Sequence, residues 1–382
     1  MLALAALCLA TGIAPAEAGE LSIHGFFTQA WARANFVDGT TTPTSREVAL
    51  GIPEDGTTDY RIGALQFAYE MSEKSRMIVQ LSTRAVGSSP VEQVEDEVEL
   101  DWAFYEYRPN NTTRFRIGRI QIPFGIYNEI RDVGTLLPFY RPPYEVYGAG
   151  TYTSETVDGV LAAHELFTGS DWSLEIAGYY GEHEVIETRV FERPPTAVLG
   201  TASDVFGAQL WLETPVEGLR FGLAGTVFAL NDGSPDLRGA GEEQDADQWL
   251  GSLDLDRERW FVRAEFKLFH YGMTSVFPGA DIDSGYVQLG WRATEKLQIV
   301  GRAGWSETRF DSDLDIDYDE RAYGLAVNYS FHPTVVLKAE HHFDIELESL
   351  ELAFVPGMPT PVITRVTGTD GDYSIVSLSV SF

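Results

Sequence analysis

The chain has 382 residues, of which 44% are hydrophobic and 22% are charged, and its formal net charge is -31. This excess of carboxylates repels the phosphates of nucleic acids, so it excludes a nucleic-acid-binding protein. The one cysteine, Cys8, lies in a segment that we expect to be removed. A disulfide scaffold, a cysteine-ligated metal site and a cysteine nucleophile are therefore excluded in the mature chain.

Residues 1–18 are predicted to be a signal peptide. An uncharged apolar run ends at Ile13, and Ala16 and Ala18 fit the small-x-small cleavage pattern, which leaves Gly19 as the first mature residue. No basic residue precedes the run. An N-terminal anchor helix is the alternative, but the run is shorter than the about 20 residues that cross a bilayer. We therefore expect export.

The rest of the chain is dominated by segments of strict apolar–polar alternation, which is typical of half-buried strands. The segment 373–382 places Val376, Leu378, Val380 and Phe382 on one face and mostly serine on the other. Such segments begin near residues 20, 60, 75, 97, 114, 156, 172, 202, 219, 246, 259, 283, 297, 320, 334 and 373. The pattern predicts about sixteen strands.

The connections between these segments alternate between short and long. Short turns are expected at residues 72–74, 110–112, 168–171, 215–218, 256–258, 294–296 and 332–333, and the longest connection is 122–155. This layout is typical of outer-membrane barrels. A propeller would repeat a unit every 40 to 50 residues or so, and the sequence has no such repeat. We predict an all-β fold: one antiparallel transmembrane barrel over 19–382, with short periplasmic turns and long extracellular loops.

Aromatic residues stand at the ends of the apolar rows, where an amphipathic ring favours the membrane interface. On the short-turn side these are Trp172, Trp260, Trp291, Phe331 and Phe382, and on the long-loop side Trp31, Trp249 and Trp305. Ordinary packing of rings at strand ends is the alternative interpretation.

Two stretches resemble a known family. The sequence RIGRIQIPFG at 116–125, which follows WAFYEY at 102–107, is similar to the strand pair that leads into the third loop of Gram-negative porins. It resembles above all the porin O and P type, usually called phosphate-selective, and YNEIRD at 127–132 extends the likeness. The terminal Phe382 is similar to the signal that the barrel assembly machinery reads. The remaining chain resembles these porins only in barrel architecture.

The resemblance implies a sixteen-stranded porin of the outer membrane, often a homotrimer, in contact with outer-membrane lipid and lipopolysaccharide. It implies that the third loop, about 122–155, folds inward as a constriction, that small solutes pass, and that no cofactor is needed. Phosphate-selective members use clustered lysines and an arginine ladder. This chain departs from that pattern, because its lysines are scattered at Lys74, Lys267, Lys296 and Lys338.

Side chains alternate between the two faces of a strand, so the residues opposite the lipid-facing rows line the pore. These positions are predicted to include a row of arginines. Arginine suits this place because its fork of donors stays charged at any working pH. Opposite charges are available in the third loop, so a transverse field there would filter ions and orient solutes. The alternative is that the arginines merely pair with inward Glu99, Asp101, Glu265 and Glu340. The pore-lining candidates are Arg76, Arg84, Arg114, Arg116, Arg263, Arg292 and Arg302, and the constriction candidates are Glu129, Arg131, Asp132, Arg141 and Glu145.

Other chemistry is weakly indicated. The acidic run 311–320 resembles the start of a calcium loop, but Ile316 stands where the sharp turn needs glycine, so we expect loose binding of divalent ions. His341 and His342 point to opposite faces of one strand, and no Gly-x-Ser-x-Gly elbow is present. We predict a passive diffusion channel that is not an enzyme. A non-conducting anchor or adhesin, or a barrel enzyme, is the alternative, and about sixteen strands favour an aqueous lumen.

Overall fold

The structure, a computed structural model, describes residues 19–36, 46, 50–93, 98–148, 155–167, 169–189, 194–235, 237–311, 317–353 and 362–382. The predicted signal peptide lies outside these residues. The described residues form sixteen strands: β1 (Glu20–Phe36), β2 (Thr57–Ser72), β3 (Ser75–Val86), β4 (Glu99–Tyr107), β5 (Thr113–Gln121), β6 (Thr156–Leu166), β7 (Ser173–Arg189), β8 (Thr196–Glu213), β9 (Leu219–Asp232), β10 (Gln244–Asp256), β11 (Trp260–Tyr271), β12 (Ala280–Arg292), β13 (Leu297–Phe310), β14 (Asp317–His332), β15 (Val335–Ala353) and β16 (Val362–Ser381).

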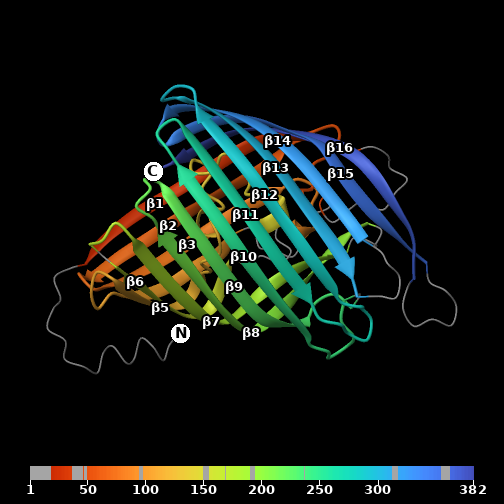
Figure 1. The fold of residues 1–382 in the computed structure, drawn as a ribbon, viewed down its shortest axis with the longest axis horizontal. Coiled ribbons are helices and arrows are strands. Elements are labelled where there is room, and N and C mark those ends of the chain that lie inside the picture. The colour runs from red at the N-terminus through yellow and green to blue at the C-terminus, as the bar shows by residue number, and fades with distance from the viewer. Residues whose placement is uncertain are drawn as a thin grey trace.

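The strands form one closed antiparallel barrel. Each strand pairs with its neighbour in sequence, and β1 pairs with β16 from Phe26↔Ser381 to Phe36↔Gly371, which closes the sheet. Figure 1 shows the long tilted strands running around the barrel. The predicted fold class is confirmed.

Predicted strand starts lie within three residues of the observed ones except at two strands. We expected β8 near 202 and β16 near 373, but they begin at Thr196 and Val362. Both early stretches continue a ladder with a neighbour of nearly the same length, since Thr196 pairs with Arg189 and Val362 with Ala353. Backbone pairing needs no alternation of side chains, so these two strands begin before the apolar pattern does.

The outward face is apolar over much of the barrel. On β9, Phe221, Leu223 and Val227 are exposed, and the intervening side chains are buried or half-buried inside the barrel. All eight aromatic residues predicted at strand ends are exposed. Lipid offers no hydrogen bonds to backbone, and a closed barrel leaves no strand edge unpaired.

Part of the interior is filled by the connection 122–155, called loop 3 below, of which 122–148 and 155 are described. It carries the short helices η2 (Asn128–Ile130) and α3 (Tyr144–Tyr147); η1 (Pro90–Gln93) lies between β3 and β4. Ile122, Phe124 and Val146 of this loop belong to one buried cluster with Phe228 of β9 and Leu250 of β10. Among the described residues, no helix is long and apolar enough to cross a membrane.

Candidate functional site

Loop 3 is held against the inner wall by polar side chains of distant strands. The Nζ of Lys267 on β11 donates to the carbonyl of Val146 at 2.6 Å, and that of Lys338 on β15 donates to the carbonyl of Phe139 at 3.0 Å. Asn328 of β14 donates to the carbonyl of Pro138 at 2.8 Å. Both lysines are buried, so their donors satisfy carbonyls that water does not reach.

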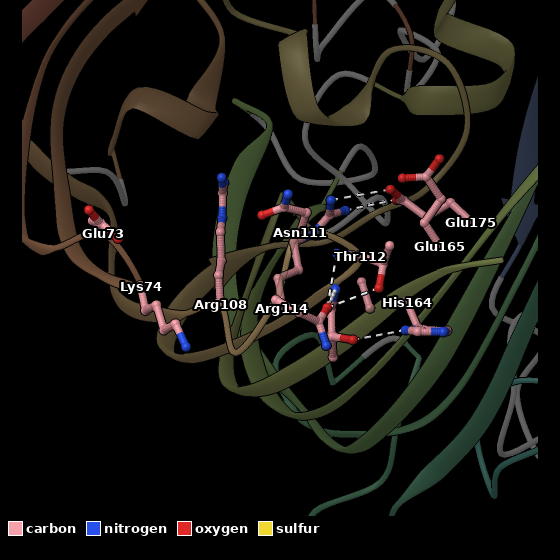
Figure 2. Close-up of a pocket in the computed structure, with 12 residues that line it drawn as sticks. Glu73, Lys74, Arg108, Asn111, Thr112, Arg114, His164, Glu165 and Glu175 are labelled. Atoms are coloured by element: carbon pink, nitrogen blue, oxygen red, sulfur yellow. Dashed lines mark hydrogen bonds and ion pairs between the residues drawn. The ribbon is translucent and has the colours of Figure 1, made fainter. Parts of the chain in front are cut away.

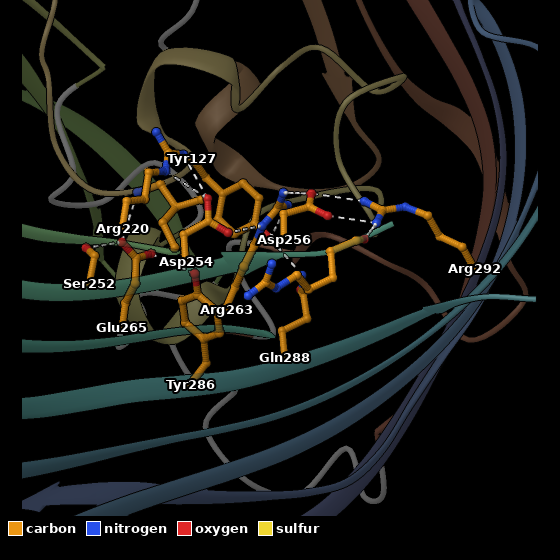
Figure 3. Close-up of polar contacts among 12 residues, drawn as sticks. Tyr127, Arg220, Ser252, Asp254, Asp256, Arg263, Glu265, Tyr286, Gln288 and Arg292 are labelled. Atoms are coloured by element: carbon orange, nitrogen blue, oxygen red, sulfur yellow. Dashed lines mark hydrogen bonds and ion pairs between the residues drawn. The ribbon is translucent and has the colours of Figure 1, made fainter. Parts of the chain in front are cut away.

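Glu265 of β11 is the centre of a second anchor. Its carboxylate accepts from the backbone N–H of Ile126 at 2.9 Å, from the hydroxyl of Tyr286 at 2.7 Å and from that of Ser252 at 2.6 Å. The hydroxyl of Tyr147 in α3 donates to the same carboxylate. Figure 3 shows Ser252 and Tyr286 converging on Glu265. This shared acceptor fixes both ends of loop 3 to one wall.

Gly125 makes the close approach of loop 3 to that anchor geometrically feasible. Its φ is +68°, in the left-handed region, and a Cβ there would lie 2.5 Å from the carboxylate of Glu265 and 2.6 Å from Leu250. Only glycine fits such a position without strain. Its N–H donates to Gln209 of β8 at 2.7 Å.

A charged cavity of about 50 Å³ lies between loop 3 and β3. Arg84 of β3 reaches Asp132 of loop 3 at 3.4 Å and Glu155 at 3.3 Å, and Arg131 reaches Glu155 at 3.2 Å. Arg141 also lines this cavity, with its guanidinium 5.1 Å from the centre of the Tyr60 ring. Three arginines therefore face two carboxylates across it.

The two carboxyls of the charged cavity have opposite pKa shifts. Burial raises the pKa of Asp132, and the neighbouring charge of Glu155 raises it further. Burial also acts to raise the pKa of Glu155, but the guanidinium groups of Arg131 and Arg84 outweigh it and hold that pKa below its usual range. Asp132 is thus the member of this pair that takes up a proton first as the pH falls.

Loop 3 is also bridged to the connection between β1 and β2. Arg46 of that connection is buried and contacts Glu145 of α3 at 2.8 Å and Glu320 of β14 at 3.4 Å. Burial tends to raise the pKa of Glu145, but the charges of Arg46 and Arg302 keep it below its usual value. A single guanidinium therefore ties two loops to the wall.

Closer to the short turns, one buried carboxylate accepts hydrogen bonds from three arginines. Glu106 of β4 is fully buried and accepts from Arg76 and Arg116 at 2.8 and 2.7 Å, and from Arg108 at 2.7 Å. This cluster carries an excess of positive charge on the inner wall.

A second row of charged side chains crosses β9 to β12 and is drawn in Figure 3. Arg220 and Arg263 both reach Asp254, at 2.8 and 3.1 Å. Arg292 reaches Asp256 at 2.7 Å, and Arg263 lies 3.8 Å from the same carboxylate. Three arginines again outnumber two carboxylates, near the short-turn ends of these strands.

A larger cavity of about 500 Å³ opens at the short-turn rim. Figure 2 shows Arg108, Arg114 and Glu175 among the residues that line it, with Arg114 joined to Glu175. The two guanidinium nitrogens of Arg114 lie 2.8 and 3.2 Å from the Glu175 carboxylate. The inner wall is therefore polar down to this rim.

The structure pairs six of the seven predicted pore-lining arginines, all but Arg302, with carboxylates other than the four that the sequence suggested. Their partners are Glu106, Asp132, Glu155, Glu175, Asp254 and Asp256. Glu265 and Glu340 instead hold loop 3, since Glu340 accepts from the N–H of Tyr140 at 2.7 Å. Asp101 accepts from Gln80 at 2.8 Å.

The remaining predicted residues take different places. Arg302 lies 4.2 Å from the Phe139 ring centre and donates to the carbonyl of Arg141 at 3.4 Å, whereas the Glu129 side chain is exposed. The predicted site residues did not include Glu106, Asp254 or the two buried lysines, although alternation places all four inward. Residues 312–316 of the acidic run lie outside the described residues. The described part of the chain contains no group of three or more His, Asp or Glu that could hold a metal.

No protein-family model matches the chain, and no curated protein matches it. Solved structures do. OmpF of Salmonella typhi, solved with daunomycin, has a TM-score of 0.59 at 12% identity, covering 96% of this chain and 98% of its own. An anion-selective porin of Comamonas acidovorans has a TM-score of 0.58 at 9% identity, over 95% of this chain and all of that one.

The chain has the fold of an outer-membrane porin. OmpT with loop L8 deleted, an outer-membrane protein of Vibrio cholerae, also matches, with a TM-score of 0.58 at 10% identity over 96% of this chain and all of that one. At such low identity the likeness shows the porin fold alone. It does not reach the narrower porin O and P family, to which only the motif at 116–132 is similar.

Proposed function

We propose that the protein is an outer-membrane porin through which small hydrophilic solutes and ions diffuse passively. The observation that carries the proposal is the charged cavity, where Arg84 on the barrel wall faces Asp132 of loop 3 at 3.4 Å. A barrel that only anchors a surface domain gains nothing from opposed charges inside its lumen. A pore uses them to orient dipolar solutes and to filter ions at close range.

Loop 3 is proposed to act as the constriction. Its apolar side packs on β9 and β10 through Phe124 and Val146, while Arg131 and Asp132 lie toward β3. We propose that the constriction lies where loop 3 meets the barrel wall, with the charged cavity beside β3 as its polar side. Arg76, Arg114 and Arg116 extend the polar wall from there toward the short-turn rim, and Arg263 and Arg292 line the wall of β11 and β12.

The proposal extends to location and assembly. A signal peptide over 1–18 would send the chain through the inner membrane, and the barrel assembly machinery would read Phe382. The short turns would then face the periplasm and the long acidic loops would lie among lipopolysaccharide, where divalent ions bridge carboxylates and phosphates. We propose a homotrimer as the assembled form.

Single-channel recording in planar bilayers tests the proposal. Purified protein should give discrete, ohmic conductance steps, because a polar lumen admits hydrated ions. Absence of steps from correctly folded, heat-modifiable protein would refute the channel and favour a non-conducting anchor.

Two arginine variants sharpen the test. Arg84→Gln should shift the reversal potential in a salt gradient toward cation selectivity, because Asp132 and Glu155 lose a counter-charge. Arg116→Gln should shift it less, since Glu106 keeps Arg76 and Arg108. Equal shifts in the two variants, or no shift in either, would show that the selective site lies outside the charged cavity.

A further inference from the structure

A second connection enters the long-loop end of the lumen beside loop 3. The described part of the connection between β1 and β2, Arg46 and residues 50–56, is called loop 1 below. Leu50 is buried in the same apolar cluster as Tyr140 of loop 3. The hydroxyl of Tyr60 on β2 donates to the carbonyl of Leu50 at 2.9 Å. Because the Tyr60 side chain is buried on the inner face of the wall, loop 1 fills part of the lumen.

Loop 1 is interlocked with the connection that follows β3, whose residues 87–93 are called loop 2 below. The N–H and the hydroxyl of Ser88 both donate to the carbonyl of Gly51, at 2.8 and 3.1 Å. A Cβ on Gly51 would overlap the carbonyl oxygen of Val86, so the two backbones touch there. Main-chain contacts of this closeness leave no room for a solute between loop 1 and loop 2.

Loop 2 forms part of the boundary of the charged cavity. Val91 of η1 is buried and lines this cavity together with Arg84 and Arg141. Beyond the cavity, η1 lies beside β7 and β8, so loop 2 reaches past the three strands between β3 and β7. These three are the shortest strands of the barrel, with 9, 9 and 11 residues. The charged cavity is therefore bounded by loop 2 as well as by loop 3.

Arg46 joins loop 1 to loop 3 through buried charges. Its guanidinium lies 2.8 Å from Glu145 of α3 and 3.4 Å from Glu320 of β14, and all three side chains are buried. It also lies 4.5 Å from the centre of the Tyr144 ring. The Glu145 carboxylate rests on β13, where a Cβ on Gly304 would overlap it. Removing the guanidinium would leave two buried carboxylates without their shared partner, and an uncompensated buried charge is costly.

We propose that loop 1 is a second constriction segment and that Arg46 is the positioning residue that holds it, together with loop 2, against loop 3. The interlocked loops then set the largest solute that reaches the charged cavity, whereas the charges of that cavity set the ion preference. The inference rests on the channel proposed above and adds a determinant of solute size to it.

Uncharged solutes test the size limit, because their passage does not depend on the charge that a variant removes. Proteoliposomes swell at a rate set by solute entry, so a monosaccharide and a trisaccharide compare two solute sizes. In Arg46→Met, which keeps a long side chain without its charge, the trisaccharide-to-monosaccharide ratio of swelling rates should rise several-fold. An unchanged ratio in the folded variant would overturn the proposal.

Arg46→Lys separates charge from packing. Lysine keeps a positive charge near both carboxylates, so this variant should stay close to the wild-type ratio. If the lysine variant were as permeable to the trisaccharide as Arg46→Met, the charge of Arg46 would not be what holds loop 1, and the proposal would fail.

Arg238→Met is the matched control. Arg238 of the connection between β9 and β10 is also buried, and it pairs with the buried Glu187 of β7 rather than with loop 3. Its variant should leave the ratio unchanged. A rise equal to that of Arg46→Met would mean that the loss of any buried pair widens the lumen, and would refute a specific role of Arg46.

Glu145→Gln covers the case in which Arg46→Met does not fold, which heat-modifiable mobility reveals. This variant removes the charge on the loop 3 side and leaves Arg46 beside Glu320, so the ratio should again rise. No rise in folded Glu145→Gln would overturn the link between the loops. Wild-type liposomes that admit neither sugar would refute the channel itself, whereas a permeable wild type with unchanged variants would refute this inference alone.

Discussion

Asp132 is the carboxyl of the charged cavity that takes up a proton before its neighbour Glu155 as the pH falls. Its pKa is raised by burial and by Glu155, so it becomes neutral at a higher pH than an ordinary aspartate, while Glu155 stays charged. Three arginines then face one carboxylate. We expect the channel to become more anion-selective as the pH falls, with the change beginning above the pH range in which an ordinary aspartate titrates.

Reversal potentials in a salt gradient measure this change. Asp132→Asn should show the anion-shifted value already at neutral pH and lose most of the pH dependence. A variant that titrates like the wild type would show that other carboxyls control selectivity.

Adding one methyl group at Gly125 should lower the free energy of unfolding. In Gly125→Ala the new Cβ meets Glu265, Tyr147 and Leu250 within 2.6 Å, and the φ of +68° adds strain. We expect a loss of about 1–3 kcal/mol in the free energy of unfolding, measured by guanidinium titration in detergent.

Gly241→Ala is the matched control. Gly241 has a φ of +75° but nothing within 4 Å of its Cβ position, so this variant carries the backbone strain without the contact. An equal loss in both variants would mean that the packing of loop 3 on Glu265 adds nothing to stability.

At the scale of elements, loop 3 is the segment whose removal should change transport. Replacing residues 128–143 with a short glycine–serine linker removes Asp132 and the contacts of Phe139 and Tyr140 with β15. We expect single-channel conductance to rise, because the lumen widens beside β3. Heat-modifiable mobility on gels checks that the barrel still forms, and unchanged conductance in a folded variant would place the constriction elsewhere.

Elements were largely predictable from sequence because alternation and turn chemistry are local. The contacts of loop 3 were not. Lys267 and Lys338 donate to carbonyls 121 and 199 positions away, and the acceptors are backbone atoms that every residue has. The partner of Arg116 depends on the register between β4 and β5, which pairs it directly with Glu106. One sequence shows the parity of a strand but not its register with the next.

At the scale of the whole molecule, Phe382 helps to hold the closure of the barrel. The N–H of Phe382 donates to the carbonyl of Gly25 at 2.9 Å, and the N–H of Gly25 donates back at 3.0 Å. A Cβ on Gly25 would lie 2.6 Å from the Phe382 ring, so the ring packs on that glycine.

Deleting Phe382 removes both hydrogen bonds and the ring at the closure, so barrel assembly should slow and unfolded protein should accumulate in the periplasm. Phe382→Ala keeps the backbone bonds and isolates the ring. Pulse-chase measurement of heat-modifiable protein follows both. Normal assembly of the deletion would show that the terminal phenylalanine is not read.

The closure of β1 on β16 also fixes when the barrel becomes complete. Thr28 and Ser379 share a hydrogen bond across 351 positions of sequence, so one of the longest-range contacts is needed to join the sheet. Contacts of such separation are slow to form, and until they do both end strands are open edges. A chain cut before Val362 lacks the strand that covers β1, so its unpaired edges would recruit strands from other molecules and aggregate instead of inserting.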